Sequence, residues 1–159
     1  MPGQEDFDRQ LNDRGRKSAA MLALHLQRKS IRPDIILCSA AKRTRQTHEN
    51  MLSALVGIPV FYEKRLYLAH EKFMLERLRK LDDRVKTVLM IAHNPGTENL
   101  AMLMVDPDSG GDLAGLGRLQ DKYPTCGFTA LSAFVDNWAS LSPGLCRIEA
   151  FVSPRDLGG

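Results

Sequence analysis

Long hydrophobic runs, a large excess of one charge and a cysteine framework are all missing from this sequence. No apolar stretch among its 159 residues approaches the roughly 18 to 20 needed to cross a membrane, and residues 1–6 have neither the basic start nor the apolar core of a signal peptide. The 22 basic and 19 acidic residues are interspersed and leave a net charge of +3, too small to indicate binding to nucleic acid or to a membrane. The three cysteines have no Cys-x-x-Cys spacing and indicate neither disulfides nor a zinc site. We therefore expect a cytoplasmic protein with reduced thiols.

The remaining composition is that of an ordinary globular protein. Apolar residues make up 43% of the chain and charged residues 26%, which is far from the composition of disordered proteins. No internal repeat, low-complexity tract or linker-like change in composition divides the sequence. A single domain over residues 1–159 is therefore expected, with enough length to bury a core.

Hydrophobic periodicity predicts helices that alternate with strands. Asn12, Ser39 and Asn94 are each expected to cap a helix, with Pro95 as the first residue of the helix after Asn94. These three helices are predicted to end near residues 29, 56 and 105, a fourth helix covers residues 71–81, and strands cover residues 34–38, 60–62, 87–92, 128–135 and 145–152.

The strand runs indicate the kind of sheet. Residues 34–38 and 87–92 are continuously apolar, which is typical of strands that are covered on both faces in a parallel sheet. Residues 106–126 are rich in glycine and lack clear periodicity, so a long loop of the kind that is usually functional is expected there. The alternation as a whole predicts an α/β fold with a mostly parallel sheet.

Two polar residues stand where ligands gather in such folds, at the carboxyl ends of the strands. Arg43 lies about one turn into the helix that follows the first buried strand, and His93 directly follows the second, beside the start of another helix. A guanidinium fork, an imidazole and two helix N-termini that converge would bind a tetrahedral oxyanion such as phosphate. Taken singly, Arg43 also fits a solvated helix face and His93 a structural histidine.

Five segments in order resemble one known family. They are FDRQLNDRG (residues 7–15), CSAAKRTRQT (38–47), LYLA (66–69), AHNPG (92–96) and KYPTCG (122–127). Together they resemble the histidine phosphatase superfamily, and within it the small phosphohistidine phosphatase branch. The resemblance covers nearly the whole chain and implies a three-layer α/β sandwich of the phosphoglycerate-mutase-like type.

The resemblance also implies a mechanism and roles for individual residues. In the family, a histidine of an Arg-His-Gly or Arg-His-Ala motif accepts the phosphoryl group, and water then removes it. Arg43 matches a phosphate-clamping arginine and His93 the second histidine, which contacts the phosphoryl oxygens; both are expected to be catalytic. Arg9, Asn94 and Thr125 are the candidate substrate-binding residues. No cofactor or metal is expected, because no cluster shows metal-ligand spacing.

The substrate class follows from a departure from the family pattern. Many members carry a glutamate acid after the third strand, whereas residues 66–69 contain no carboxylate. Because an imidazole leaving group needs less protonation than an alkoxide, a phosphohistidine or another phosphoramidate is favoured over a sugar phosphate. A phosphohistidine protein is therefore the expected partner, and the oligomeric state is left open.

The Arg-His dipeptide itself is absent from the sequence. The first histidine is His25, which lies in mid-helix and is expected to be structural. We interpret the chain as lacking the family's first strand, an interior one, together with the nucleophile. Little turnover and poor solubility are expected of a chain that begins at Met1, because unpaired ladder groups and bare sheet edges are costly.

Other interpretations are weighed against this one. A non-catalytic phosphate-binding or regulatory module of the same fold would keep Arg43 and His93 without the nucleophile. A nucleotide-binding protein is disfavoured, because residues 110–117 match neither a dinucleotide fingerprint nor a P-loop. Asp6-Phe7-Asp8 resembles an aspartyl-phosphatase motif but follows no strand, and Cys126 has no base partner. His48 and His70 are expected to be packing or surface residues.

Overall fold

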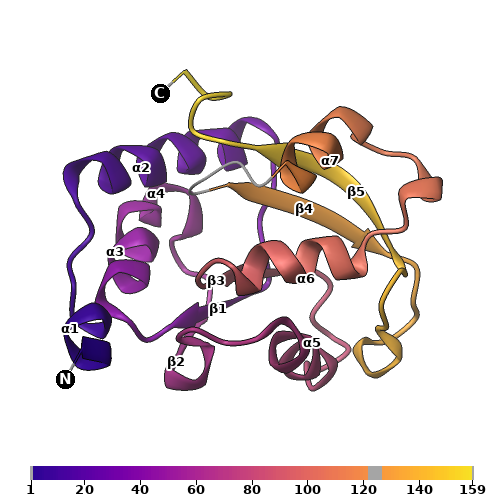
Figure 1. The fold of residues 1–159 in the computed structure, drawn as a ribbon, viewed down its shortest axis with the longest axis horizontal. Coiled ribbons are helices and arrows are strands. Elements are labelled where there is room, and N and C mark those ends of the chain that lie inside the picture. The colour runs from indigo at the N-terminus through magenta and orange to yellow at the C-terminus, as the bar shows by residue number, and fades with distance from the viewer. Residues whose placement is uncertain (1, 122–126, 159) are drawn as a thin grey trace. The chain divides into compact units, whose positions relative to one another are not determined.

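The computed structural model describes residues 2–121 and 127–158, and these residues form two compact units (Figure 1). The first unit comprises residues 2–69 and 85–93, and the second comprises residues 70–84, 94–121 and 127–158. In the part of the chain that is described, no helix is long and apolar enough to cross a membrane.

A parallel three-stranded sheet forms the centre of the first unit. Its strands are β1 (Ile35–Ser39), β2 (Val60–Glu63) and β3 (Val88–Ile91), in the order β2-β1-β3. Ile36 and Leu37 of the central strand are fully buried, because β1 has a strand on each side and apolar residues on both faces. The predicted parallel α/β arrangement is thus confirmed.

β3 differs from the prediction of a strand covered on both faces. All four of its residues keep part of their surface exposed. β3 pairs with β1 along one edge, and no strand of the described residues pairs with the other edge. Its apolar sequence therefore does not correspond to full burial.

Four α-helices belong to the first unit: α1 (Pro2–Phe7), α2 (Asp13–Arg28), α3 (Lys42–Asn50) and α4 (Leu52–Leu55), with a 3₁₀ turn η1 (Lys64–Leu66). Asn12 caps α2 as predicted, and its side chain accepts a hydrogen bond from the Gly15 N–H. α2 packs against both α3 and α4. Ala23 and Leu26 of α2 lie in the core at about 1% exposure, on the face that the periodicity predicted.

The expected helix from Ser39 to Val56 is wrong in two respects. Ser39 is the last residue of β1, and Ala41, which has no capping side chain, precedes α3. Met51 then separates α3 from α4, and its buried side chain contributes to the core. The hydroxyl of Ser39 does not cap a helix, because it is used at the functional site described below.

The second unit combines helices with an antiparallel strand pair. Its elements are α5 (Glu71–Arg79), α6 (Gly96–Met104), η2 (Pro107–Ser109), α7 (Leu113–Gln120), β4 (Phe128–Ala133), η3 (Trp138–Ser140) and β5 (Cys146–Val152). The two strands predicted at the end of the chain are confirmed, and they pair antiparallel with a register shift at Ala130 and Leu131. α5 packs against α6, and α7 packs against β5.

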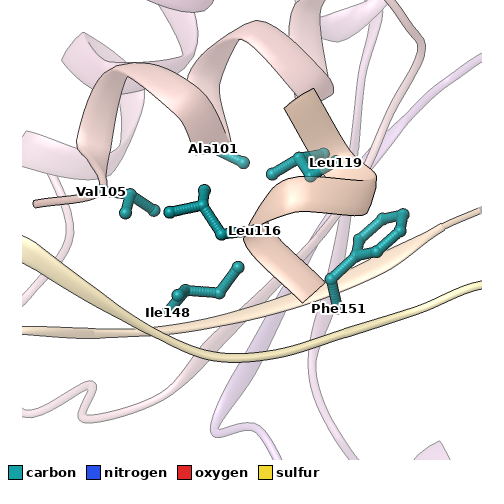
Figure 2. Packing of buried hydrophobic residues seen from close by; sticks show 6 residues of the cluster. All are labelled: Ala101, Val105, Leu116, Leu119, Ile148 and Phe151. Atoms are coloured by element: carbon teal, nitrogen blue, oxygen red, sulfur yellow. The ribbon is translucent and has the colours of Figure 1, made fainter. Parts of the chain in front are cut away.

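The long loop predicted over residues 106–126 is wrong for much of its length, because it contains α7. Asp112 caps this helix by accepting a hydrogen bond from the Gly115 N–H. Figure 2 shows that Leu116 and Leu119 pack with residues of α6 and β5. The other members of this cluster are Ala101, Val105, Ile148 and Phe151. Tertiary packing therefore stabilises a glycine-containing helix that periodicity did not reveal.

The start of α6 also differs from the prediction. The helix begins at Gly96, Pro95 occupies the preceding cap position, and the Asn94–Pro95 peptide bond is cis. Asn94 is therefore not the helix cap. Its side-chain oxygen instead accepts a hydrogen bond from the Thr97 hydroxyl.

Candidate functional site

The structure brings the side chains of Arg43 and His93 into contact within the first unit. Arg43 is the second residue of α3, which follows β1, and His93 comes two residues after β3. Since β1 and β3 are parallel neighbours, both residues lie at the carboxyl edge of the same sheet. The Nη2 atom of Arg43 lies 3.4 Å from Nδ1 of His93.

The second ring nitrogen of His93 is held by Ser39, the last residue of β1. His93 Nε2 lies 2.8 Å from Ser39 Oγ. Arg43 can only donate a hydrogen bond, so Nδ1 of His93 accepts and the proton of a neutral ring lies on Nε2, facing the Ser39 hydroxyl. The ring of Tyr67 meets the imidazole edge to face, with 5.3 Å between centroids. These contacts fix both the orientation and the tautomer of His93.

The imidazole of His93 is neutral at pH 7. Its side chain is buried, with 8% of the residue exposed. Burial and, to a smaller extent, the positive charge of Arg43 lower its pKa to about 4, although the carboxylate of Asp6 opposes the change. Arg43 therefore supplies the positive charge of the site, and His93 supplies a fixed dipole.

A carboxylate from the N-terminal helix completes the cluster. Arg43 donates to Asp6 twice, from Nη1 to the backbone oxygen at 2.7 Å and from Nη2 to Oδ2 at 3.2 Å. The hydroxyl of Tyr67 donates to the same Oδ2 atom. Arg9 lies further out, with Nη2 at 3.6 Å from Asp6 Oδ1. Hydrogen bonds from Tyr67 and Arg43 hold the pKa of Asp6 below its usual value, and the bond to Asp6 raises the pKa of Tyr67.

Comparison with known proteins gives the same direction. A profile of the histidine phosphatase superfamily (branch 1) matches residues 1–67. An uncharacterized protein of Mycobacterium tuberculosis is 33% identical over 153 residues, 96% of this chain and 94% of the relative. The crystal structure of an Agrobacterium tumefaciens protein assigned as the phosphohistidine phosphatase SixA is 30% identical, has a TM-score of 0.77, and matches over 97% of this chain and 89% of its own.

The chain belongs to the histidine phosphatase superfamily. The family and its solved members support a phosphatase-type, hydrolytic function. More distant structures share the fold: a Nakamurella multipartita protein assigned as SixA is 23% identical with a TM-score of 0.80, over 94% of this chain and 87% of its own. A protein histidine phosphatase SixA complexed with tungstate is 19% identical with a TM-score of 0.74, over 96% of this chain and 88% of its own.

The other predicted site residues of this histidine phosphatase have separate placements. Arg9 reaches the cluster only through Asp6, and 68% of its side chain is exposed. Asn94 is exposed and bonded to Thr97. Thr125 and Cys126 lie outside the described residues. The predicted roles of Arg9, Asn94 and Thr125 remain predictions.

The remaining histidines and cysteines are engaged elsewhere. His48 is buried, and its Nδ1 lies 2.7 Å from the Tyr62 hydroxyl. His70 caps α5 by accepting a hydrogen bond from the Lys72 N–H. Cys38 is a buried free thiol, and burial raises its pKa to about 12, so it is protonated and unreactive at neutral pH. Across the described residues, no group of three or more His, Cys, Asp or Glu could hold a metal ion.

Three contributors to the site of this phosphatase were missed from sequence. Ser39 was interpreted as a helix cap, although its place at the end of β1 is the position where ligand-contacting residues gather. Tyr67 lies in the LYLA segment of the family resemblance, which signals the position but not the hydroxyl contact. Asp6 has no sequence signal of its own, since its contact with Arg43 spans 37 positions of the chain.

Proposed function

We propose that Arg43 and His93 bind the phosphoryl group of a phosphohistidine or another phosphoramidate, and that the reaction is hydrolysis through a phosphohistidine intermediate. One observation carries the proposal, the 3.4 Å contact between the two side chains at the ends of adjacent parallel strands. A phosphohistidine protein is the proposed partner.

The electrostatics of the pair suit an oxyanion. Arg43 has a planar fork of five N–H donors, and 20% of its side chain is exposed, so solvent reaches part of the fork. Phosphoryl transfer asks the protein mainly for positioning and for stabilisation of charge on the equatorial oxygens. A phosphoryl group next to the neutral imidazole of His93 would also favour its protonated form, since opposite charges at short range stabilise each other. The pair can therefore gain positive charge when the anion binds.

The leaving group follows from what lies after β2. Residues 66–69 include Tyr67 but no carboxylate, and the Tyr67 hydroxyl is bonded to Asp6. Burial and the bond to Asp6 raise the pKa of Tyr67 above its ordinary value, which makes it a weak acid. An imidazole leaving group, which needs little protonation, suits such a site better than an alkoxide.

The phosphoryl acceptor is a separate part of the proposal. The sequence has four histidines, and the hydrogen-bond contact that Arg43 makes with an imidazole in the described residues is to His93. The lone pair of His93 Nδ1 faces Arg43 and Nε2 faces Ser39, so this ring is suited to orient a phosphoryl group rather than to attack it. We propose that the acceptor is a histidine on a first strand that this sequence does not contain. The chain as printed then binds without turning over.

Anion binding tests the site itself. We expect inorganic phosphate and vanadate to bind the protein in calorimetric titrations, and Arg43→Met to lose at least tenfold in affinity. Arg16→Met is the matched control, because it removes one positive charge from an exposed pair with Asp13 in the same unit. If Arg43→Met binds as tightly as the wild type, the proposed site is wrong.

Turnover separates the enzyme from the alternative, a phosphate-binding or regulatory module, which is favoured by the engaged nitrogens of His93. The test compares the chain as printed with a chain preceded by the residues encoded upstream of codon 1. Hydrolysis of phosphoramidate and phosphohistidine is expected from the longer chain alone. Anion binding without turnover in both chains would support the binding module, and equal activity in both would refute the missing acceptor.

A further inference from the structure

We infer that Asp6 is an internal competitor for the proposed phosphoryl site: its carboxylate occupies the guanidinium fork of Arg43, and an incoming phosphoryl group must displace it. Asp6 thereby sets the affinity and the anion selectivity of the site. This inference rests on the proposed function and deepens it.

The position of the carboxylate supports competition. Asp6 Oδ2 receives two donors, Arg43 Nη2 at 3.2 Å and the Tyr67 hydroxyl. Arg9 lies 3.6 Å from the other oxygen, Oδ1. A carboxylate is thus surrounded by two guanidinium groups and a hydroxyl, and these are the donors that a phosphoryl oxygen would use. The same Nη2 atom also faces His93, so Asp6 and a phosphoryl group at the Arg43–His93 pair would compete for it.

The charge of Asp6 acts in the same direction. Its hydrogen bonds keep the pKa of the carboxyl low, so it is ionised at neutral pH. A second anion placed beside it would be repelled, and the repulsion grows with the charge of that anion. Asp6 should therefore weaken the binding of a phosphate dianion more than that of a monoanion.

Displacement is possible because the carboxylate is only lightly held. Asp6 keeps 35% of its side chain exposed, so the carboxylate can rotate into water. The end of α1 has other attachments that remain when it does. Arg43 Nη1 bonds the Asp6 backbone oxygen at 2.7 Å, and the ring of Phe7 packs edge to face on Tyr67 with centroids 5.1 Å apart. The carboxylate can leave without unfolding the helix.

Asp6→Asn tests the inference by removing the charge while keeping the shape. Inorganic phosphate is titrated at pH 8, where the dianion dominates, and at pH 5.5, where the monoanion dominates. We expect Asp6→Asn to bind roughly fivefold more tightly than the wild type at pH 8, with a smaller gain at pH 5.5. Asp13→Asn is the matched control, because Asp13 is fully exposed and pairs with Arg16 instead; it should change affinity less than twofold. Asp6→Ser serves as a second variant if Asp6→Asn does not fold.

The Arg43→Met substitution, alone and with Asp6→Asn, distinguishes the two levels of the argument. If binding depends on Arg43 but Asp6→Asn binds no more tightly than the wild type, Asp6 supports the site rather than competing for it, and the inference is overturned while the proposed function stands. If the double variant binds as well as Asp6→Asn, or no variant binds phosphate, the proposed function itself fails and the inference fails with it.

Discussion

Single residues at strand ends carry most of what this site can do. Arg43 and His93 could be singled out from sequence, because a cation and an imidazole directly after buried strands are rarely needed for packing. The contacts that orient them could not, since Ser39 and Tyr67 act through hydroxyl positions that depend on how β1, β3 and η1 come together. A residue type at a strand end predicts location, and only the fold determines its partners.

The depressed pKa of His93 predicts a pH dependence of stability. The folded state holds the imidazole neutral down to a pKa of about 4, whereas the unfolded chain protonates it near the model value of 6.5. The unfolded state therefore binds more protons between these values, so the free energy of unfolding should fall as the pH drops from about 6.5 to about 4. The share of His93 is about 2 to 3 kcal/mol. Urea denaturation of wild type and His93→Gln across this range should show a shallower slope for the variant; parallel slopes would contradict the prediction.

Ser39→Ala should cost stability beyond the loss of one surface hydroxyl. Ser39 is fully buried, and its Oγ serves both His93 Nε2 at 2.8 Å and the Ala41 N–H at 3.3 Å. Removing it leaves a buried imidazole N–H without its partner, at a cost of about 1 to 3 kcal/mol. The exposed Ser53→Ala substitution is the matched control and should stay within about 0.5 kcal/mol of the wild type. Similar unfolding midpoints for the two variants would show that the Ser39 contact contributes nothing.

At the scale of secondary-structure elements, prediction succeeded where apolar periodicity and capping agreed. α2 combines an Asn12 cap with a regular apolar face, and its boundaries follow from both. α7 has the cap but places glycine at positions 115 and 117, so its periodicity is too weak to read from sequence. Its stability comes from burial of Leu116 and Leu119 against the rest of the second unit, which is tertiary information.

The two glycines of α7 should respond oppositely to alanine. A Cβ atom at Gly115 would lie 2.1 Å from Asp112 Oδ2, the carboxylate that caps the helix, whereas a Cβ at Gly117 would meet nothing within 4 Å. Gly117→Ala should stabilise the protein by up to about 1 kcal/mol through helix propensity. Gly115→Ala should destabilise it by about 1 to 2 kcal/mol, because it displaces the cap. Thermal unfolding of the pair checks this, and equal shifts would refute the role of the cap.

At the scale of the whole molecule, the sequence predicted the fold class and the direction of the strands. It did not predict that the described strands would form two separate sheets, one parallel and one antiparallel. The reason is that apolar runs report burial of side chains, whereas sheet membership depends on which backbone edges meet. β3 illustrates the difference, because its run is as apolar as that of β1 while its residues remain half exposed.

Hydrogen exchange of β3 tests where the parallel sheet ends. The Thr87 carbonyl accepts a hydrogen bond from the Asp34 N–H, so the alternation of a strand directs the amides of Leu89 and Ile91 toward β1 and those of Val88 and Met90 away from it. If the second edge is open, the amides of Val88 and Met90 should exchange at least about tenfold faster than their neighbours, at rates set by local exposure rather than by global unfolding. Amide-resolved exchange measured by NMR gives the comparison within one strand, so each protected amide is the control for the one beside it. Equal protection of all four amides would mean that another backbone segment covers this edge, and the parallel sheet would then extend beyond β3.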